Sequence, residues 1–222
     1  MKRGLTILAL GTILALSGCG NSNTATESTT EITTEQESSL NENTSNGKVL
    51  TVYFSWASNV ENDDVDGISS ASIVDGNYHL VADYVNNLVG GDVFEIKTDE
   101  KYPVDYNKTV DIAADEKKND ARPSLTSHID NISDYDTIVL IYPNWWGTYP
   151  MAVATFLQEY DFNGKTILPL CTNEGSGMGS SEEDLSKLVT NANIKEGLAI
   201  RGGKVENSQK NIEQWLKDSG VL

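Results

Sequence analysis

Residues 138–150 read Ile138-Val139-Leu140-Ile141-Tyr142-Pro143-Asn144-Trp145-Trp146-Gly147-Thr148-Tyr149-Pro150. The apolar run that opens this segment is typical of a strand buried on both faces, and it ends at Pro143. Loops at the carboxyl ends of such strands hold the ligands of open α/β sheets. The indoles of Trp145 and Trp146 offer flat apolar faces to a planar ring, and the alternative is that both tryptophans cap the core.

Strand-like runs alternate with helical patterns along the rest of the domain. Strands are expected at 49–54, 93–96, 137–142, 165–171 and 194–200, and helices at 78–89, 105–120, 151–160, 181–189 and 208–218. This alternation predicts right-handed βαβ units. The predicted fold is therefore a doubly wound α/β fold, a five-stranded parallel sheet of order 2-1-3-4-5 with helices on both faces. Pro169 is unusual in the fourth strand, because proline cannot donate to a sheet ladder.

The N-terminal segment has the order of a targeting signal. Lys2 and Arg3 precede an apolar run over 5–16, and Leu16-Ser17-Gly18-Cys19 ends the segment. This order resembles the bacterial lipoprotein signal, which implies a signal peptide over 1–18 and a lipid on Cys19. We expect the protein on the extracytoplasmic face of the bacterial cell membrane, anchored through Cys19 only. An ordinary signal peptide or a membrane anchor is the alternative.

Residues 19–47 are expected to be a disordered tether, because they are mostly Asn, Ser, Thr, Glu and Gln with almost no apolar side chains. Residues 48–222 are long enough for one domain with its own core. The formal net charge is −17, and loss of Lys2 and Arg3 with the signal changes it to −19. Nothing concentrates positive charge, so the sequence argues against a nucleic-acid partner.

Cysteine and histidine are scarce. Cys171 is the one cysteine besides Cys19, so no internal disulfide is expected if Cys19 is lipidated. Cys171 ends an apolar run, which favours a buried structural thiol over a reactive one. His79 and His128 lie far apart in the sequence, and no Cys/His cluster suggests a metal site.

Three loops are expected to meet at the carboxyl edge of the sheet. The first loop is 55–59, the second loop is 143–149 and the third loop is 172–179. Hydroxyl groups and small residues before a helix favour a phosphate, since unpaired backbone N–H groups point outward there. No Lys or Arg lies in these loops, so phosphate binding would depend on neutral donors and the helix dipole.

Together the three loops resemble the flavodoxin family, in its branch that carries Tyr-Pro-x-Trp-Trp-Gly. The matching segments are Val52-Tyr53-Phe54-Ser55, Gly76-Asn77, Tyr102-Pro103-x-x-Tyr106, 141–148 and Cys171-Thr172-Asn173-Glu174-Gly175-Ser176-Gly177. The similarity extends over 48–222, and the resemblance implies a flavodoxin-like fold that binds FMN.

The resemblance also implies a role for each loop. Ser55, Trp56 and Ala57, with Asn77, would hold the phosphate, and Thr172, Asn173 and Gly175 would cover one edge of the ring. Pro143, Asn144, Trp145, Trp146, Gly147 and Thr148 would lie along the isoalloxazine, with Trp145 or Trp146 against it and Gly147 near N5. Glu174 is the one carboxylate in these loops that could lower the potential, and a solvent-facing position is the more favoured interpretation.

The sequence departs from the family pattern in one place. An Asp-rich insertion separates Asn59 from Gly76, so Ser58-Asn59 and Asn77-Tyr78 both qualify as the helix start. The leading hypothesis is an electron carrier between a redox protein or small-molecule donor and an acceptor. The alternatives are an NAD(P)H-dependent FMN quinone-type reductase and a flavin-free binding module on the same fold.

Overall fold

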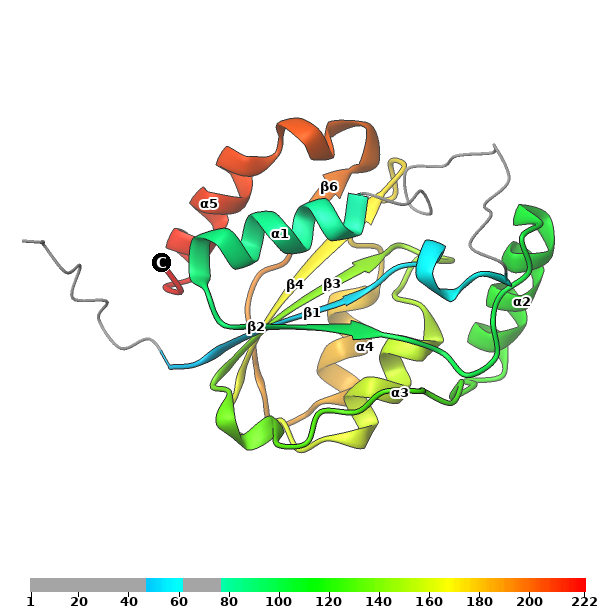
Figure 1. Ribbon diagram of the computed structural model, residues 1–222, viewed down its shortest axis with the longest axis horizontal. Helices are drawn as coiled ribbons and strands as arrows, with labels where there is room; N and C mark the ends of the chain where they lie inside the picture. Colours follow the sequence, from blue (N-terminus) through cyan, green and yellow to red (C-terminus); the bar gives the residue numbers. More distant parts are fainter. Residues whose placement is uncertain (1–46, 62–76) are drawn as a thin grey trace, which may run out of the picture. The chain divides into compact units, whose positions relative to one another are not determined.

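The computed structural model describes residues 47–61 and 77–222, and its strands form one parallel sheet. The strand order is β2-β1-β3-β4-β5, with β6 also paired to β4, which confirms the predicted doubly wound arrangement (Figure 1). The strands are β1 (Val49–Phe54), β2 (Asp92–Ile96), β3 (Thr137–Pro143), β4 (Thr166–Asn173), β5 (Asn193–Ile194) and β6 (Leu198–Arg201).

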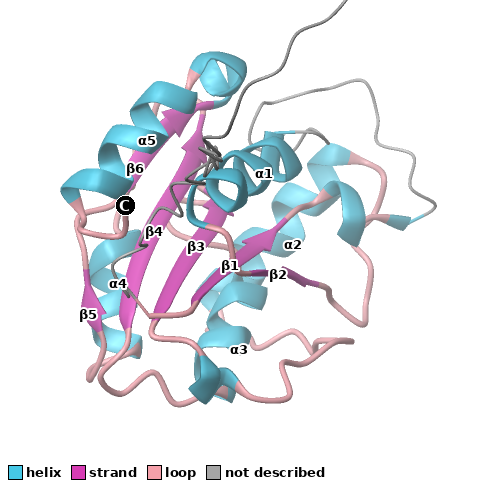
Figure 2. Cartoon of the chain, turned by 60° about the vertical axis from the view of Figure 1, so that its left-hand side comes forward, coloured by secondary structure: helices cyan, strands magenta, loops and turns pink. Residues whose placement is uncertain are grey.

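Helices cover both faces of the sheet, as expected, and one helix stands apart. Figures 1 and 2 show α1 and α5 on one face and α3 and α4 on the other, whereas α2 lies beyond the carboxyl ends of the strands. That position brings α2 close to the loops that follow the central strands. The helices are α1 (Asn77–Val89), α2 (Tyr106–Lys118), α3 (Met151–Glu159), α4 (Ser181–Leu188) and α5 (Gln209–Asp218).

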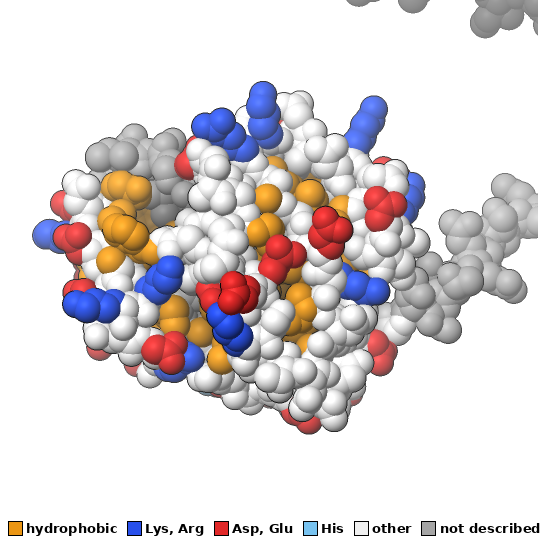
Figure 3. All heavy atoms as spheres, turned by 180° about the vertical axis from the view of Figure 1, so that it is seen from behind, with side chains coloured by type: hydrophobic (Ala, Val, Ile, Leu, Met, Phe, Trp, Pro, Cys, Tyr) orange, Lys and Arg blue, Asp and Glu red, His pale blue; other side chains and the backbone are white. Residues whose placement is uncertain are grey.

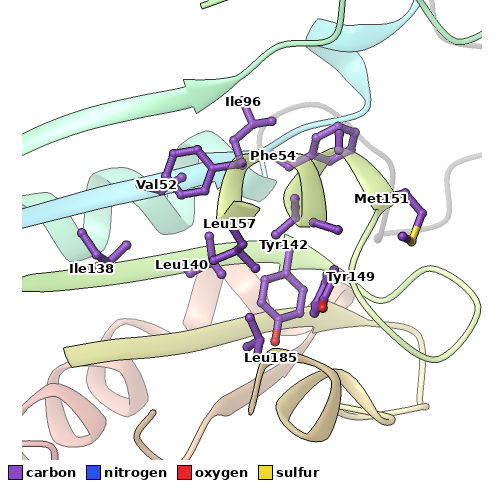
Figure 4. Packing of buried hydrophobic residues seen from close by; sticks show 14 of the residues in the cluster. Val52, Phe54, Ile96, Ile138, Leu140, Tyr142, Tyr149, Met151, Leu157 and Leu185 are labelled. Carbon is purple, nitrogen blue, oxygen red and sulfur yellow. The ribbon is translucent and has the colours of Figure 1, made fainter. Parts of the chain in front are cut away.

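The central strand β3 is buried on both sides, as its apolar run predicts. Ile138, Leu140 and Tyr142 belong to the core under α3 and α4, and Figure 4 shows them beside the side chains of that core. Val139 and Ile141 point to the opposite core, under α1 and α5. Alternation of side chains along a strand produces this division, and it fixes the end of β3 between two packed layers.

The predicted fifth strand is two short strands, β5 and β6. On this side of β4, pairing stops after Ile167 and resumes at Leu170, and Pro169 lies in the gap. Proline has no N–H to donate, so the edge strand is interrupted where the ladder lacks a donor. The prediction of one continuous strand over 194–200 is therefore wrong, although the place of the strand in the sheet is right.

The helix that follows β1 begins at Asn77, which decides between the two starts that the sequence allowed. Ala57, Ser58 and Asn59 form the short 3₁₀ helix η1 (Ala57–Asn59) instead. The expected signal peptide, Cys19 and the tether over 19–46 lie outside the described residues. Within 47–61 and 77–222, no helix has the length and apolar character needed to cross a membrane.

Candidate functional site

The three loops follow three neighbouring strands, β1, β3 and β4, so they meet at one edge of the sheet. In the second loop, residues 145–148 form a two-residue hairpin turn. Trp145 and Thr148 exchange both backbone hydrogen bonds, with N···O distances of 2.8 and 3.1 Å. Trp146 (φ 54°) and Gly147 (φ 84°) occupy its centre. Two positive φ angles define a type I′ turn, and for Trp146 this conformation costs about 1 kcal/mol.

The two adjacent tryptophans have different surroundings. The Trp145 ring packs edge-on against Phe54 and Tyr102, with centroids 5.4 and 5.3 Å apart, so Trp145 caps the core. Trp146 is 54% exposed, and its indole N–H donates to the Val110 carbonyl of α2 at 3.0 Å. Trp146 is therefore the indole that remains open to a ligand, and the core-capping interpretation holds for Trp145 alone.

Hydrogen bonds tie the second loop to the third. The Asn144 side chain donates to the Gly177 carbonyl at 2.9 Å, and its backbone N–H donates to Thr172 at 2.8 Å. The Gly147 carbonyl accepts from the Ser180 N–H at 2.7 Å, and the Ser180 hydroxyl, 3.1 Å from that carbonyl, lies closer to the Asp184 carboxylate at 2.8 Å. A Cβ atom at Gly179 would clash with that carbonyl, so glycine is required at 179.

The third loop is shaped around one buried side chain, Asn173. Its amide oxygen accepts from the N–H groups of Gly175 and Gly177 at 2.8 and 3.1 Å, and its amide nitrogen donates to Ile200 at 3.2 Å. Gly175 has a φ of 134°, which L side chains rarely adopt. Asn173 thus acts inside the protein, and the exposed Glu174 beside it faces solvent, as the favoured interpretation expected.

The first loop is packed into the core. Trp56 is 1% exposed and Ala57 is buried as well. Asn59 anchors the loop: its amide nitrogen donates to Ser55 and Ile96 carbonyls at 2.7 and 3.0 Å, and its oxygen accepts from the Thr98 N–H at 2.7 Å. Asn59 is thus a structural residue, whereas the backbone of Asn77 opens α1.

Buried polar atoms without a partner gather in these loops. Buried side-chain oxygens and nitrogens are nearly always hydrogen-bonded, so each exception in the described residues requires an explanation. Four of the five exceptions belong to the three loops, and the fifth is Thr51 in the middle of β1. The four atoms are Ser55 Oγ, Trp56 Nε1, Thr148 Oγ1 and Thr172 Oγ1. This concentration is the arrangement expected where a polar ligand completes a site.

Two lysines reach the loops from other elements, which the sequence did not indicate. Lys101 Nζ donates to the Ser58 carbonyl at 2.8 Å, and Lys117 Nζ donates to the Trp146 carbonyl from the last turn of α2. Positive charge therefore lies beside the first and second loops, although neither loop contains a cation. No sequence signal links α2 to the second loop, because α2 lies outside the two layers that alternation predicts.

Cys171 is fully buried, which confirms the interpretation as a structural thiol. Burial raises the pKa of this thiol to about 12, so it stays neutral at pH 7. In the part of the chain that the structure describes, no three His, Cys, Asp or Glu side chains form a group that could hold a metal ion. The rear surface shows acidic and basic side chains interspersed around apolar patches (Figure 3).

Known structures resemble this domain over most of their length. A candidate flavoprotein from Bacteroides eggerthii is 27% identical, with a TM-score of 0.63, and the match covers 80% of this chain and 100% of that one. A similar protein from Bacteroides uniformis is also 27% identical, with a TM-score of 0.60 and coverage of 77% and 98%. A flavoprotein from Lactobacillus acidophilus, solved in complex with FMN, shares the fold at 20% identity and a TM-score of 0.53, covering 72% and 97%.

A search of curated proteins found no match. The family model described as Flavodoxin matches residues 67–219, which is more than half of the chain. This match agrees with the strand order and with the three loops that meet at the carboxyl edge of the sheet. The chain belongs to the flavodoxin family.

Proposed function

We propose that this protein binds FMN in the three loops and carries electrons while a lipid on Cys19 tethers it to the membrane. The observation that carries the proposal is the set of unpartnered buried atoms on Ser55, Trp56, Thr148 and Thr172. FMN supplies the reversible uptake of electrons, and the protein supplies orientation and polar surroundings. Family membership and the FMN complex of the Lactobacillus acidophilus flavoprotein support this ligand.

The phosphate would lie near the end of β1. The Ser55 hydroxyl is buried there without a partner. Helix α1 begins at Asn77, and the first N–H groups of a helix have no carbonyl partner within the helix. The backbone of Trp56 and Ala57 completes this group. Lys101, bound to the Ser58 carbonyl, adds a positive charge next to the first loop. Neutral donors with one nearby cation suit a phosphate dianion.

The ring would lie along the second loop, with Pro143, Asn144, Trp146, Gly147 and Thr148 beside it. Thr172, with its unpartnered hydroxyl, and Gly175 supply the remaining contacts, whereas the side chains of Trp145 and Asn173 are engaged inside the protein. Trp146 offers its exposed indole, and its turn is fixed before any ligand arrives. A ring beside an exposed side chain is accessible from solvent, where an electron donor or acceptor can approach. A redox protein or a small molecule could fill either role.

An absorbance spectrum of the isolated chain tests FMN binding. We expect flavin bands in the purified protein, and tight one-to-one binding when FMN is added back after its removal. Riboflavin, which lacks the phosphate, should bind at least tenfold more weakly, since charge-assisted hydrogen bonds contribute about 1.5–3 kcal/mol. A colourless protein whose tryptophan fluorescence does not respond to micromolar FMN would contradict the proposal and favour a flavin-free binding module.

Two further assays test the role and the tether. Rapid one-electron exchange with a redox protein, without NAD(P)H oxidation in the presence of a quinone, is the result expected for a carrier. Steady NAD(P)H oxidation with a quinone would instead indicate a reductase. Metabolic labelling with a fatty acid should mark the wild type and leave Cys19→Ser unlabelled, and label that survives this substitution would exclude lipidation of Cys19.

A further inference from the structure

A cavity of about 300 Å³ lies behind the second loop, on the side of the sheet that α3 and α4 cover. Its wall comes from segments that are distant in the sequence: the end of α2, the second loop, the start of α3 and the second half of α4. The apolar part of the wall consists of Met151, Ala154 and Leu188. A cavity of this volume is at the lower end of the range for small-molecule sites.

Two residues of the second loop line this cavity with buried hydroxyl groups that have no partner among the described residues. Thr148 is 4% exposed, and its Oγ1 is unpartnered. Tyr149 is 5% exposed, and no described residue is hydrogen-bonded to its phenol. The Tyr142 phenol, whose ring packs on Tyr149 (Figure 4), is instead bound to Ser181 at 2.9 Å. Buried polar groups are rarely unpaired, so two in one cavity indicate a missing partner.

The charged side chains of the wall favour an anion as that partner. Arg122 binds the Asp120 carboxylate through both terminal nitrogens, at 2.8 and 3.3 Å, so these two charges compensate each other. The wall also contains Lys117 and Lys187, and it has one further carboxylate, Asp184. The cavity therefore has an excess of positive charge in a chain whose formal net charge is −17.

Both ammonium groups retain donors for a ligand. Lys117 donates to the Trp146 carbonyl, which occupies one of its three N–H groups. Lys187 pairs with Glu183 at 2.6 Å, but the two side chains are 67% and 70% exposed, and such exposed pairs contribute little. Either lysine can therefore turn toward an anion at low cost.

We propose that this cavity is a second binding site, which takes a small organic acid with an apolar body. The hydroxyls of Thr148 and Tyr149 would donate to the carboxylate, and the two lysines would compensate its charge. Burial raises the pKa of Tyr149 above its ordinary value of 10.0, so the phenol keeps its proton at pH 7. Thr148 borders both this cavity and the turn proposed for the flavin, whereas Tyr149 belongs to the cavity alone.

Three probes of similar size, benzoate, benzamide and benzylamine, test the charge preference. An NMR titration of the ¹⁵N-labelled full chain, with and without FMN, should show benzoate binding with a Kd of about 10 mM or below, as expected for so small a ligand. The shifted amides should lie in the second loop and at the start of α3. Benzamide and benzylamine should bind at least about fivefold more weakly, because neither offers an acceptor with a negative charge.

Tyr149→Phe removes the phenol oxygen and keeps the ring that packs on Tyr142. It should weaken benzoate binding about fivefold and leave FMN affinity unchanged. Tyr84→Phe is the matched control: its phenol donates to the Glu206 carbonyl at 3.4 Å from α1, on the opposite face of the sheet, and its loss should change neither affinity. If Tyr149→Phe fails to fold, Lys187→Gln at the exposed rim provides the same test and should also weaken benzoate binding.

The proposal is overturned if benzoate causes no shifts well above this Kd, if the three probes bind equally, or if FMN displaces benzoate. Equal benzoate affinity in the wild type and in the folded cavity variant would also overturn it. The proposed function is tested separately, because a chain that fails to bind FMN can still bind benzoate here, and the reverse.

Discussion

The first loop and the second loop are built in opposite ways. The first loop packs its tryptophan into the core, where Trp56 is 1% exposed, whereas the second loop presents Trp146 at 54% exposure. The first loop is anchored by one buried side chain, Asn59, whereas the second loop is anchored by hydrogen bonds that it donates to the third loop and to α2. The comparison indicates that one side of the site depends on the core for its shape and the other on its neighbouring loops.

The largest difference should appear in stability when the two tryptophans are removed. Trp56→Ala should lower the free energy of unfolding by about 3–5 kcal/mol, because it leaves a cavity under the first loop. Trp146→Ala should change it by less than about 1 kcal/mol, since most of this side chain already contacts water. Urea denaturation of both variants measures the two values, and similar losses would contradict the proposed contrast.

Removal of the anchor of the first loop should have the next largest effect. Asn59→Ala leaves the Thr98 N–H and two carbonyl groups without partners in a buried place. The expected loss is about 2–3 kcal/mol of unfolding free energy. Asn87→Ala, an exposed position in α1, serves as the control and should cost nothing measurable. A loss under 0.5 kcal/mol, about the size of a surface substitution, would show that Asn59 does not hold the loop.

Trp146→Ala, which should have little effect on stability, should have a clear effect on FMN affinity. Trp146→Ala should weaken FMN binding about tenfold, the size of one aromatic stacking contact. Ile112→Ala, which removes an exposed apolar side chain from α2, should leave the affinity unchanged. Fluorescence titration measures both constants. Equal FMN affinities in the wild type and Trp146→Ala would show that the flavin ring does not contact Trp146.

The smallest expected effect is on the pH dependence of stability, and it concerns Glu116, the hydrogen-bond partner of Tyr102. Tyr102 packs on Trp145 and donates to Glu116, and burial raises the pKa of the Glu116 carboxyl above its ordinary value of 4.5. The folded state then retains this proton more strongly than the unfolded chain. Its contribution to stability is therefore complete below pH 4.5 and falls as the pH rises through the raised pKa.

Glu116→Gln keeps an acceptor for Tyr102 and removes the buried charge. It should raise the free energy of unfolding at pH 7 by less than about 1 kcal/mol and have little effect below the ordinary pKa. Chemical denaturation at several pH values provides the comparison. A variant with the same pH slope as the wild type would show that Glu116 does not titrate with folding.

The sequence predicted the layers of this fold better than it predicted its edges. The run over 138–141 is apolar at every position, which is the pattern of a strand between two packed layers. Pro169 indicated an irregularity in the sheet, but not that the neighbouring edge strand would be interrupted. That outcome depends on how residues 193–201 pair with the two halves of β4. The position of α2 was not predictable, since it packs beyond the sheet rather than on a face.

The site was predictable in its location and less so in its contacts. Strand alternation alone brings the ends of β1, β3 and β4 together, so the three loops were correctly expected to meet. The different environments of Trp145 and Trp146 follow from a type I′ turn, which a Trp-Gly pair does not specify. Lys117 and Ser180 come from distant segments, and their bonds to the turn exist only in the folded chain.

The most direct test of the account compares two buried hydroxyls that have no partner in the described structure. Ser55 lies in the first loop, and Thr51 lies in β1, the strand that precedes this loop. Ser55→Ala should weaken FMN binding about tenfold without weakening riboflavin binding, whereas Thr51→Ala should leave both affinities unchanged. Equal effects of the two substitutions on FMN affinity would contradict a phosphate site at the end of β1.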